Sequence, residues 1–332
     1  MIKVAVDAMG GDNAPDEIVK GAVSAARKSS NLEIYLCGIP SAINSVLDKT
    51  ENVPSERIHI IEATEVIETA EPPVAAIRKK KDSSLVKALN LVKEGEADAV
   101  VSAGSTGAIL VGGQVIVGKA KGIKRAPLAP LIPTKRGVSL LIDCGANVDP
   151  RPEHLLSFAK MGAIYMEHVM GVPNPTVGIV NIGGEEEKGN ALVKETFPLL
   201  KECKDINFVG SVEARDIPHG AVDVAVTDAF SGNVILKTYE GVGAVLISEI
   251  KAGLTSSLKA KIGALLSKSA LKKTLKRFDA SEYGGAPLLG LKGLVVKAHG
   301  SSTEKEIRNS ILQCRKFMQQ DILGKIEQGL NS

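Results

Sequence analysis

The chain has few aromatic residues, no tryptophan and no long uninterrupted apolar run. Aromatics make up 3% of its 332 residues, so a hydrophobic core must be built from Val, Ile, Leu and Ala. No stretch reaches the roughly 18 apolar residues of a spanning helix. The first residues, MIKVAVDAMGGD, resemble a strand and lack the pattern of a signal peptide. We therefore expect a soluble or at most peripheral protein.

Cysteine is also scarce, and the recognised signatures for metals and nucleotides are missing. The four cysteines (Cys37, Cys144, Cys203 and Cys314) are far apart and form no CxxC pair, which predicts reduced, mostly buried thiols in a cytoplasmic protein. The histidines show no metal-ligand spacing, so we expect no metal. A Walker lysine pattern, a GxGxxG fingerprint and a GxSxG elbow are all absent. A net charge of +3 is too small to indicate nucleic acid.

Short β-branched runs recur along the chain and alternate with segments of helical spacing. This alternation predicts βαβ units around a largely parallel sheet, that is, an α/β fold. The predicted strands cover 2–8, 33–38, 58–63, 97–104, 138–145, 176–183, 206–212, 222–229 and 293–300.

Polar residues and glycines collect where these runs end. They are Asp7, Gly104, Asp143, Gly145, Gly183, Asp228 and His299. In open α/β sheets the carboxyl edge is where ligands bind, so these residues predict a shared site. The alternative is that Gly and Asp simply end strands, as they often do.

The turn SAGSTGA (102–108) follows one strand and opens a predicted helix. Gly104 and Gly107 allow close backbone approach to a ligand, and the hydroxyls of Ser105 and Thr106 lie at the helix start. Free N–H groups and the helix dipole favour an anion there. The alternative is a plain N-cap with flexible glycines.

Two further loops after predicted strands also combine glycines with charged residues. DAMGGD (7–12) places Gly10 and Gly11 between acidic residues. NIGGEEEKG (181–189) places Gly183 and Gly184 before acidic residues, followed by Lys188, which we expect to open a helix. A lysine is unfavourable at a helix N-terminus, so it is a candidate for neutralising a bound anion. The alternative is an exposed surface lysine.

Two segments offer catalytic candidates. TDAFSGNVILK (227–237) places Asn233 at a predicted helix start with Lys237 one turn later. The Asn amide could donate to a developing oxyanion, or it could be an N-cap. KAHGSS (297–302) puts His299 at a strand end, although a lone histidine is more often structural.

The segment 254–278 carries seven Lys or Arg and no acidic residue. Its apolar stripe changes phase around 267–269, which predicts two short amphipathic helices joined by a bend. Basic amphipathic helices bind anionic membrane surfaces. The alternative is a helical hairpin packed at a dimer interface, and both can hold. A second basic cluster, RKKK (78–81), is either solvated or a guide for an acidic protein partner.

Taken together, the motifs resemble the family of bacterial phosphate acyltransferases of phospholipid synthesis, which make acyl phosphate from acyl-acyl-carrier protein and inorganic phosphate. The resemblance runs end to end through DAMGGD, SAGSTGA, DCGAN, NIGGEEEKG, NFVGSVEA, TDAFSGNVILK, YGGAPLLG and HGSS. The family usually has Asn at Ser105 and Ser211 and Gly at Ala229. We expect Ala229 to have a negative φ.

The resemblance implies a single domain over 1–332, with a Rossmann-like αβα sandwich akin to the isocitrate dehydrogenase and phosphotransacetylase group. A protruding amphipathic hairpin at about 254–278 would contact an anionic membrane surface at the inner face of the cell membrane. It also implies a homodimer, no cofactor and no nucleic acid. The membrane-contacting residues would be Leu258, Ile262, Leu265, Leu266 and Leu271.

The implied chemistry is direct attack of phosphate on a long-chain acyl thioester. We expect phosphate among Gly104–Gly107 and Lys188, with Asn233 or His299 at the thioester oxyanion or the leaving sulfur. The predicted substrate-binding residues are Asp7, Gly10, Gly11, Gly104, Ser105, Thr106, Gly107, Asp143, Asn147, Asp228 and Lys237. Two alternatives remain, a membrane-associated scaffold that recruits acyl carrier protein and a nicotinamide-dependent dehydrogenase of the same architecture.

Overall fold

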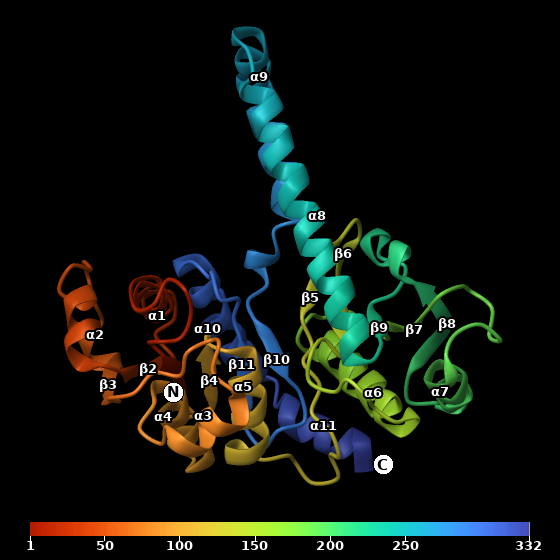
Figure 1. The fold of residues 1–332 in the computed structure, drawn as a ribbon, viewed down its shortest axis with the longest axis horizontal. Helices are drawn as coiled ribbons and strands as arrows, with labels where there is room; N and C mark the ends of the chain where they lie inside the picture. Colours follow the sequence, from red (N-terminus) through yellow and green to blue (C-terminus); the bar gives the residue numbers. More distant parts are fainter. Residues whose placement is uncertain (332) are drawn as a thin grey trace. The chain divides into compact units, whose positions relative to one another are not determined.

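A computed structural model describes residues 1–331, and the chain forms two compact units within it (Figure 1). Unit 1 comprises Met1–Pro130, Lys160–Asn174 and Ser281–Ser332, of which the last residue is outside the description. Unit 2 comprises Leu131–Ala159 and Pro175–Ala280. Each unit is described by itself. The single functional domain expected over 1–332 stays a prediction.

Unit 1 is built on a six-stranded sheet with the order β10-β11-β4-β1-β2-β3. All neighbours are parallel except the edge pair β10 and β11. The strands are β1 (Ile2–Asp7), β2 (Leu32–Gly38), β3 (Ile58–Glu62), β4 (Ala99–Ser102), β10 (Ala286–Leu288) and β11 (Leu294–Lys297). The interior of β1 and all of β4 are buried, as expected for strands covered by helices on both faces.

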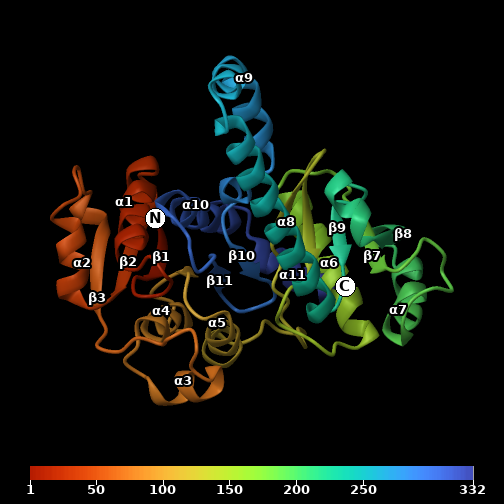
Figure 2. The ribbon, with the colours of Figure 1, turned by 45° about the horizontal axis from the view of Figure 1, so that its top comes forward.

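Helices cover both faces of this sheet. In Figures 1 and 2, α1 and α10 lie on one face, and α4 and α5 lie on the other. The helices of unit 1 are α1 (Asp16–Lys28), α2 (Pro40–Leu47), α3 (Pro73–Lys79), α4 (Ser84–Lys93), α5 (Thr106–Gly112), α10 (Glu304–Gln319) and α11 (Ile322–Asn331). Short helical turns are η1 (Ser55–Arg57) and η2 (Gly113–Val117), and η4 (Ala280–Glu282) spans the boundary with unit 2.

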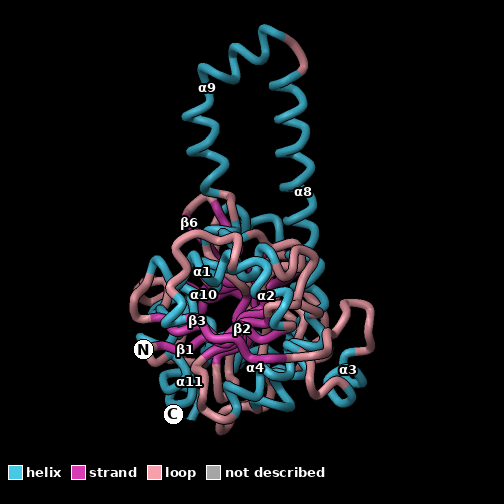
Figure 3. The backbone as a smooth tube through the Cα atoms, turned by 90° about the vertical axis from the view of Figure 1, so that its left-hand side faces the viewer, coloured by secondary structure: helices cyan, strands magenta, loops and turns pink. Residues whose placement is uncertain are grey.

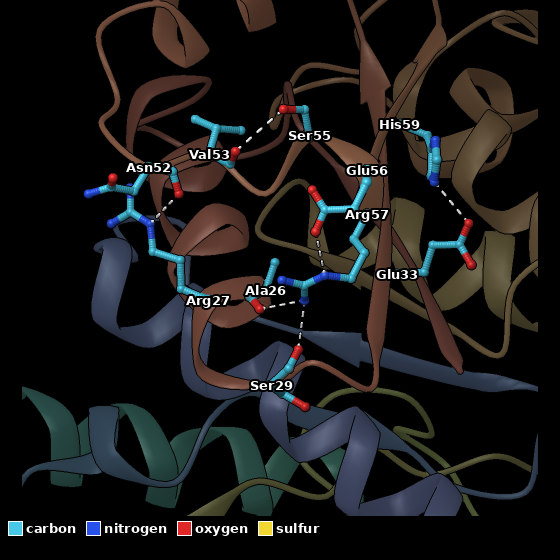
Figure 4. A network of polar contacts seen from close by, with 10 residues as sticks. All are labelled: Ala26, Arg27, Ser29, Glu33, Asn52, Val53, Ser55, Glu56, Arg57 and His59. Atoms are coloured by element: carbon cyan, nitrogen blue, oxygen red, sulfur yellow. Dashed lines mark hydrogen bonds and ion pairs between the residues drawn. The ribbon is translucent and has the colours of Figure 1, made fainter.

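A polar network holds the loop before β3 against the end of α1 (Figure 4). The Arg57 guanidinium donates to the carbonyl oxygens of Ala26 and Ser29 at 2.6 and 2.9 Å. Arg27 in turn donates to the carbonyl of Asn52 at 3.0 Å. These arginines satisfy carbonyls at the end of a helix and in a loop, so the network stabilises the fold at the amino end of β3.

Unit 2 contains a five-stranded sheet with the order β5-β6-β9-β7-β8. Its strands are β5 (Leu131–Thr134), β6 (Gly137–Ile142), β7 (Thr176–Asn181), β8 (Asn207–Glu213) and β9 (Val224–Val226). Only the edge pair β5 and β6 is antiparallel. The helices are α7 (Ala191–Glu202), η3 (Ala214–His219), α8 (Ala229–Thr255) and α9 (Leu258–Arg277), while α6 (Pro152–His168) belongs in part to each unit.

The helices α8 and α9 form a hairpin that projects beyond the sheet of unit 2 (Figure 3). All twenty residues of α9 are described, and none is buried. The bend predicted around 267–269 is wrong, because α9 runs unbroken and the turn falls at Ser256 and Ser257. Ser257 is the N-cap of α9 and accepts a hydrogen bond from the Ala260 N–H at 3.1 Å, and such a cap marks the start of a helix more strongly than a change of apolar phase does.

The α/β fold class with mostly parallel strands is confirmed. All nine predicted strands are present, but they form two sheets rather than one. The missed strands β5 and β10 are short, antiparallel and at sheet edges. Among residues 1–331, no helix combines the length and the apolar character needed to span a membrane.

Candidate functional site

In unit 1, three loops meet at the carboxyl edge of the sheet. They follow β1, β4 and β11, which are neighbours and run parallel. A methyl group on Gly10 would lie 2.4 Å from Asp7 Oδ2 and 2.8 Å from the Gly104 nitrogen. The Asp12 N–H donates to the Gly300 carbonyl at 2.8 Å. The loop after β1 lies so close to the Gly104 backbone that position 10 requires glycine.

Asp7 lies beneath these loops with 2% of its surface exposed. It accepts a hydrogen bond from the Ser102 hydroxyl at 2.6 Å, and that hydroxyl also receives the Gly104 N–H at 3.1 Å. Burial raises the pKa of the Asp7 carboxyl, and the hydrogen bond from Ser102 opposes part of this shift. Asp7 therefore anchors the loop after β4 through Ser102, a residue that the sequence motifs did not single out.

The turn SAGSTGA begins α5 as predicted, and its two hydroxyls differ. Ser105 is the N-cap: its Oγ accepts the Ala108 N–H at 3.4 Å, and its side chain is buried. Thr106 is exposed. Gly107 faces α3, because a methyl group there would lie 2.5 Å from Pro73 Cγ. The N-cap interpretation of Ser105 is confirmed, and a ligand contact by its hydroxyl stays a prediction.

His299 lies in the third loop and is exposed. Its Nδ1 is 2.8 Å from the Ser301 hydroxyl, which fixes one side of the ring. Lys297, at the end of β11, donates to the Ala103 carbonyl at 3.3 Å. The sequence motifs overlooked Lys297, although it places a positive charge near Asp7. Its position at the last residue of an apolar run was the available signal.

In unit 2, Asp143 follows β6 and organises the DCGAN loop. It is fully buried and accepts hydrogen bonds from the Asn147 backbone at 2.8 Å and the Asn147 amide at 2.6 Å. A methyl group on Gly232 would lie 1.9 Å from the Asp143 carbonyl oxygen, so α8 approaches this loop closely. Neighbouring Cys144 is buried, and burial raises its pKa, which confirms a core thiol.

The predicted helix start at Asn233 is wrong. Asp228 is the N-cap of α8 and accepts the Ser231 N–H at 2.8 Å, so Asn233 lies in the second turn with an exposed side chain. Lys237, one turn later, pairs with Glu240 at 2.8 Å. Ala229 is the first residue of α8 and has a negative φ, as expected.

Lys188 does not open a helix, because α7 begins at Ala191 with Asn190 as its cap. The Lys188 ammonium is exposed and lies 2.8 Å from the Glu185 carboxylate, whose hydrogen bond raises the lysine pKa. The side chain also lies against Gly183, where a methyl group would be 2.6 Å from Lys188 Cδ. This lysine is charged at neutral pH and held by its own loop.

The predicted residues thus fall into two groups. Unit 1 brings together Asp7, Gly10, Gly11, Gly104, Ser105, Thr106, Gly107 and His299. Unit 2 carries Asp143, Asn147, Lys188, Asp228, Asn233 and Lys237 on segments that follow the adjacent strands β6, β7 and β9. Within residues 1–331, no group of three or more His, Cys, Asp and Glu side chains is arranged to hold a metal ion.

Solved structures with a similar fold show the class of α/β fold to which this chain belongs. The fold is similar to a phosphotransacetylase from Streptococcus pyogenes, with a TM-score of 0.59 at 19% identity, over 96% of this chain and 94% of that one. It is also similar to a branched-chain phosphotransacylase from Enterococcus faecalis, with a TM-score of 0.55 at 15% identity, over 96% and 100% of the two chains. At these identities the likeness establishes the fold.

Sequence likeness then gives the family. A sequence model described as "Fatty acid synthesis protein" matches residues 2–325, and the chain belongs to that family. It is 51% identical over 327 residues to the phosphate acyltransferase of Clostridium perfringens, covering 98% of this chain and 96% of the relative. Identity to the phosphate acyltransferase of Clostridium acetobutylicum is also 51%, over 98% of both chains.

Proposed function

We propose that this protein transfers a long-chain fatty acyl group reversibly from acyl-acyl-carrier protein to inorganic phosphate, giving acyl phosphate for phospholipid synthesis. Acyl transfer to phosphate is supported by relatives named phosphate acyltransferase that match almost the whole chain. The structural observation that carries the proposal is the meeting of three glycine loops at one sheet edge in unit 1. Close backbone approach without side chains suits a small anion.

The proposed reaction is direct. A phosphate oxygen attacks the thioester carbonyl carbon, the carbon–sulfur bond breaks, and the thiolate leaves and takes up a proton. Phosphate is already nucleophilic and a thiolate leaves readily, so the protein needs mainly to position the reactants and stabilise charge. We assign phosphate to Gly104–Gly107, charge neutralisation to Lys188, and the oxyanion or leaving sulfur to Asn233 or His299.

An acidic carrier as the acyl donor is supported by the basic end of α3. Arg78, Lys79 and Lys81 are exposed there. Lys80 instead forms an ion pair with Glu71, with 2.5 Å between the ammonium nitrogen and the carboxylate oxygen. The helix has seven residues, so its basic end lies about 10 Å from Pro73, which contacts Gly107. Positive charge at this distance would speed the encounter with an acidic partner.

Attachment to an anionic membrane and homodimer formation are supported by the hairpin. Leu258, Ile262, Leu265 and Leu266 of α9 are between 54% and 82% exposed. Apolar side chains beside several lysines suit either a membrane surface or a second copy of the hairpin. The proposed location is the inner face of the cytoplasmic membrane.

Hydroxylamine trapping tests the reaction. The full-length protein is incubated with hexadecanoyl-acyl-carrier protein and phosphate, and the hydroxamate formed from acyl phosphate is measured. We expect a signal that requires both phosphate and protein. Carrier binding without hydroxamate above the protein-free control would favour the scaffold. NADH binding in a fluorescence titration, also without hydroxamate, would favour the dehydrogenase.

A further inference from the structure

Unit 2 contains a cavity of about 280 Å³ at the carboxyl edge of its sheet. It lies among the end of β7, the start of α7, the start of η3 and the loop between β9 and α8. Its apolar lining includes Leu155, Ile179, Val180, Leu192, Val193 and Ala214. This volume is just below the range of about 300–1,000 Å³ for ligand sites, which are commonly lined by apolar side chains.

Three polar side chains in the wall, those of Asn181, Asn190 and Asp228, form hydrogen bonds within the protein itself. The Asn181 amide donates to the Lys188 carbonyl and to the Ser211 hydroxyl, both at 3.1 Å. The side chains of Asn190 and Asp228 accept N–H groups as the caps of α7 and α8. An occupant therefore meets mainly apolar surface, and the Asp228 carboxylate disfavours a second anion.

Exposed apolar residues on the same sheet edge point to the same kind of ligand. Ile182 lines the cavity and is 79% exposed, and Phe230, just past the Asp228 cap, is 66% exposed. Val148, in the loop after β6, is 56% exposed. The segments that follow three adjacent parallel strands, two loops and the first turn of α8, each present a large apolar side chain at the edge where α/β sheets bind ligands.

We propose that this cavity holds part of the hydrocarbon chain of the acyl group, an assignment that rests on the acyl transfer proposed above. A methylene group is close in size to a water molecule, whose share of liquid volume is about 30 Å³, so the cavity holds roughly nine such groups. The cavity would thus make unit 2 the part of the molecule that selects chain length.

Narrowing the cavity tests this assignment. Ala214→Phe adds bulk at a lining position whose side chain is exposed, so the fold should persist, and unfolding in urea checks this. We expect the ratio of hexadecanoyl to hexanoyl transfer rates to fall about tenfold, because the narrowed cavity buries fewer methylene groups of the longer chain. Ala221→Phe, at an exposed position outside the cavity lining, is the matched control and should keep the wild-type ratio.

A binding measurement separates this proposal from the reaction itself. Hexadecanoic acid with a terminal diazirine is crosslinked to the full-length protein, and the labelled peptides are mapped. Label within 176–231 supports the cavity, whereas label confined to other segments, or an equal loss for all chain lengths in Ala214→Phe, would overturn it. If the wild type makes no acyl phosphate from any donor, the proposed function fails and the crosslink still decides the cavity.

Discussion

The two units have the same sheet edge and present opposite chemistry on it. In unit 1 the loops after β1, β4 and β11 meet through glycines, with Asp7 and Ser102 buried beneath them. In unit 2 the segments after β6, β7 and β9 expose Val148, Ile182 and Phe230, and Ile182 also lines an apolar cavity. The parallel strands give both units a carboxyl edge at which ligands can bind, and we infer that the loop residues at that edge determine which class of ligand each unit suits.

The two sheet edges also differ in how well their loops tolerate the substitution of a glycine. In unit 1 a methyl group added at Gly10 or Gly11 would lie within 3 Å of the backbone of a neighbouring loop, at Gly104 and Gly300 respectively. The exposed loop at Gly184 in unit 2 has nothing within 4 Å of such a group. The first arrangement suits precise positioning of a small anion, and the second suits adaptable contact with a flexible chain.

The largest effect is expected from Gly10→Ala. The new methyl group would collide with the Asp7 carboxylate and the Gly104 nitrogen, which should lower the free energy of unfolding by about 1–3 kcal/mol. Displacement of the loop should reduce acyl phosphate formation by roughly 100-fold or more. Urea unfolding and hydroxamate trapping measure the two effects. Gly184→Ala is the control, and similar behaviour of the two variants would remove the contrast between the edges.

The next largest effect is expected from Lys188→Ala. Loss of this charge should reduce turnover roughly 100-fold without unfolding the protein, since the side chain is exposed. Lys201→Ala is matched, because Lys201 also pairs with a glutamate of the same loop, Glu186, at 2.8 Å. Near-normal turnover in the Lys188 variant would rule out its catalytic assignment.

A smaller effect is expected at the hairpin. Leu265→Asp should weaken sedimentation with phosphatidylglycerol vesicles by about tenfold, because it removes an exposed apolar side chain and adds a negative charge. Ala270 is also exposed and lies on another face of the helix at about 3.6 residues per turn. Ala270→Asp adds the same charge without removing a large apolar side chain and should have less effect. Equal binding of wild type and Leu265→Asp would argue that the hairpin serves the dimer alone.

The smallest effects concern pH. Burial raises the pKa of Asp7 above 3.8, so the native protein holds this proton where the unfolded chain has lost it, and stability falls as pH rises through that window. Asp7→Asn should therefore gain stability relative to wild type as pH rises. Asp82, which is partly exposed, is the converse: the hydrogen bond from Lys87 lowers its pKa to about 2.

Asp82→Asn should consequently lose stability relative to wild type near neutral pH, and the loss should shrink as pH falls toward 2. Urea unfolding of both variants between about pH 3 and pH 7 measures these slopes. Parallel slopes for the two variants would contradict the contrast between the buried Asp7 and the partly exposed Asp82.

The strands and their ends could be predicted from the sequence, because buried parallel strands are continuous β-branched runs that end on Gly or Asp. The contacts between the loops could not be predicted from the sequence. That Gly10 meets Gly104, or that Ser102 connects Asp7 to the next loop, depends on strand order, which a single sequence does not specify. Asn233 was misplaced because Asp228 and Asn233 are both good caps, and only the backbone distinguishes them.

The most direct test of the account is a phosphate titration of acyl phosphate formation with hexanoyl and hexadecanoyl donors, in Thr106→Val and Ala214→Phe side by side. The Thr106 variant removes an exposed hydroxyl from the glycine loops, and we expect it to raise the KM for phosphate by about tenfold with an unchanged chain-length ratio. The Ala214 variant should change only the ratio. A shift of the phosphate KM in Ala214→Phe, or of the chain-length ratio in Thr106→Val, would contradict the division of phosphate and acyl binding between the two edges.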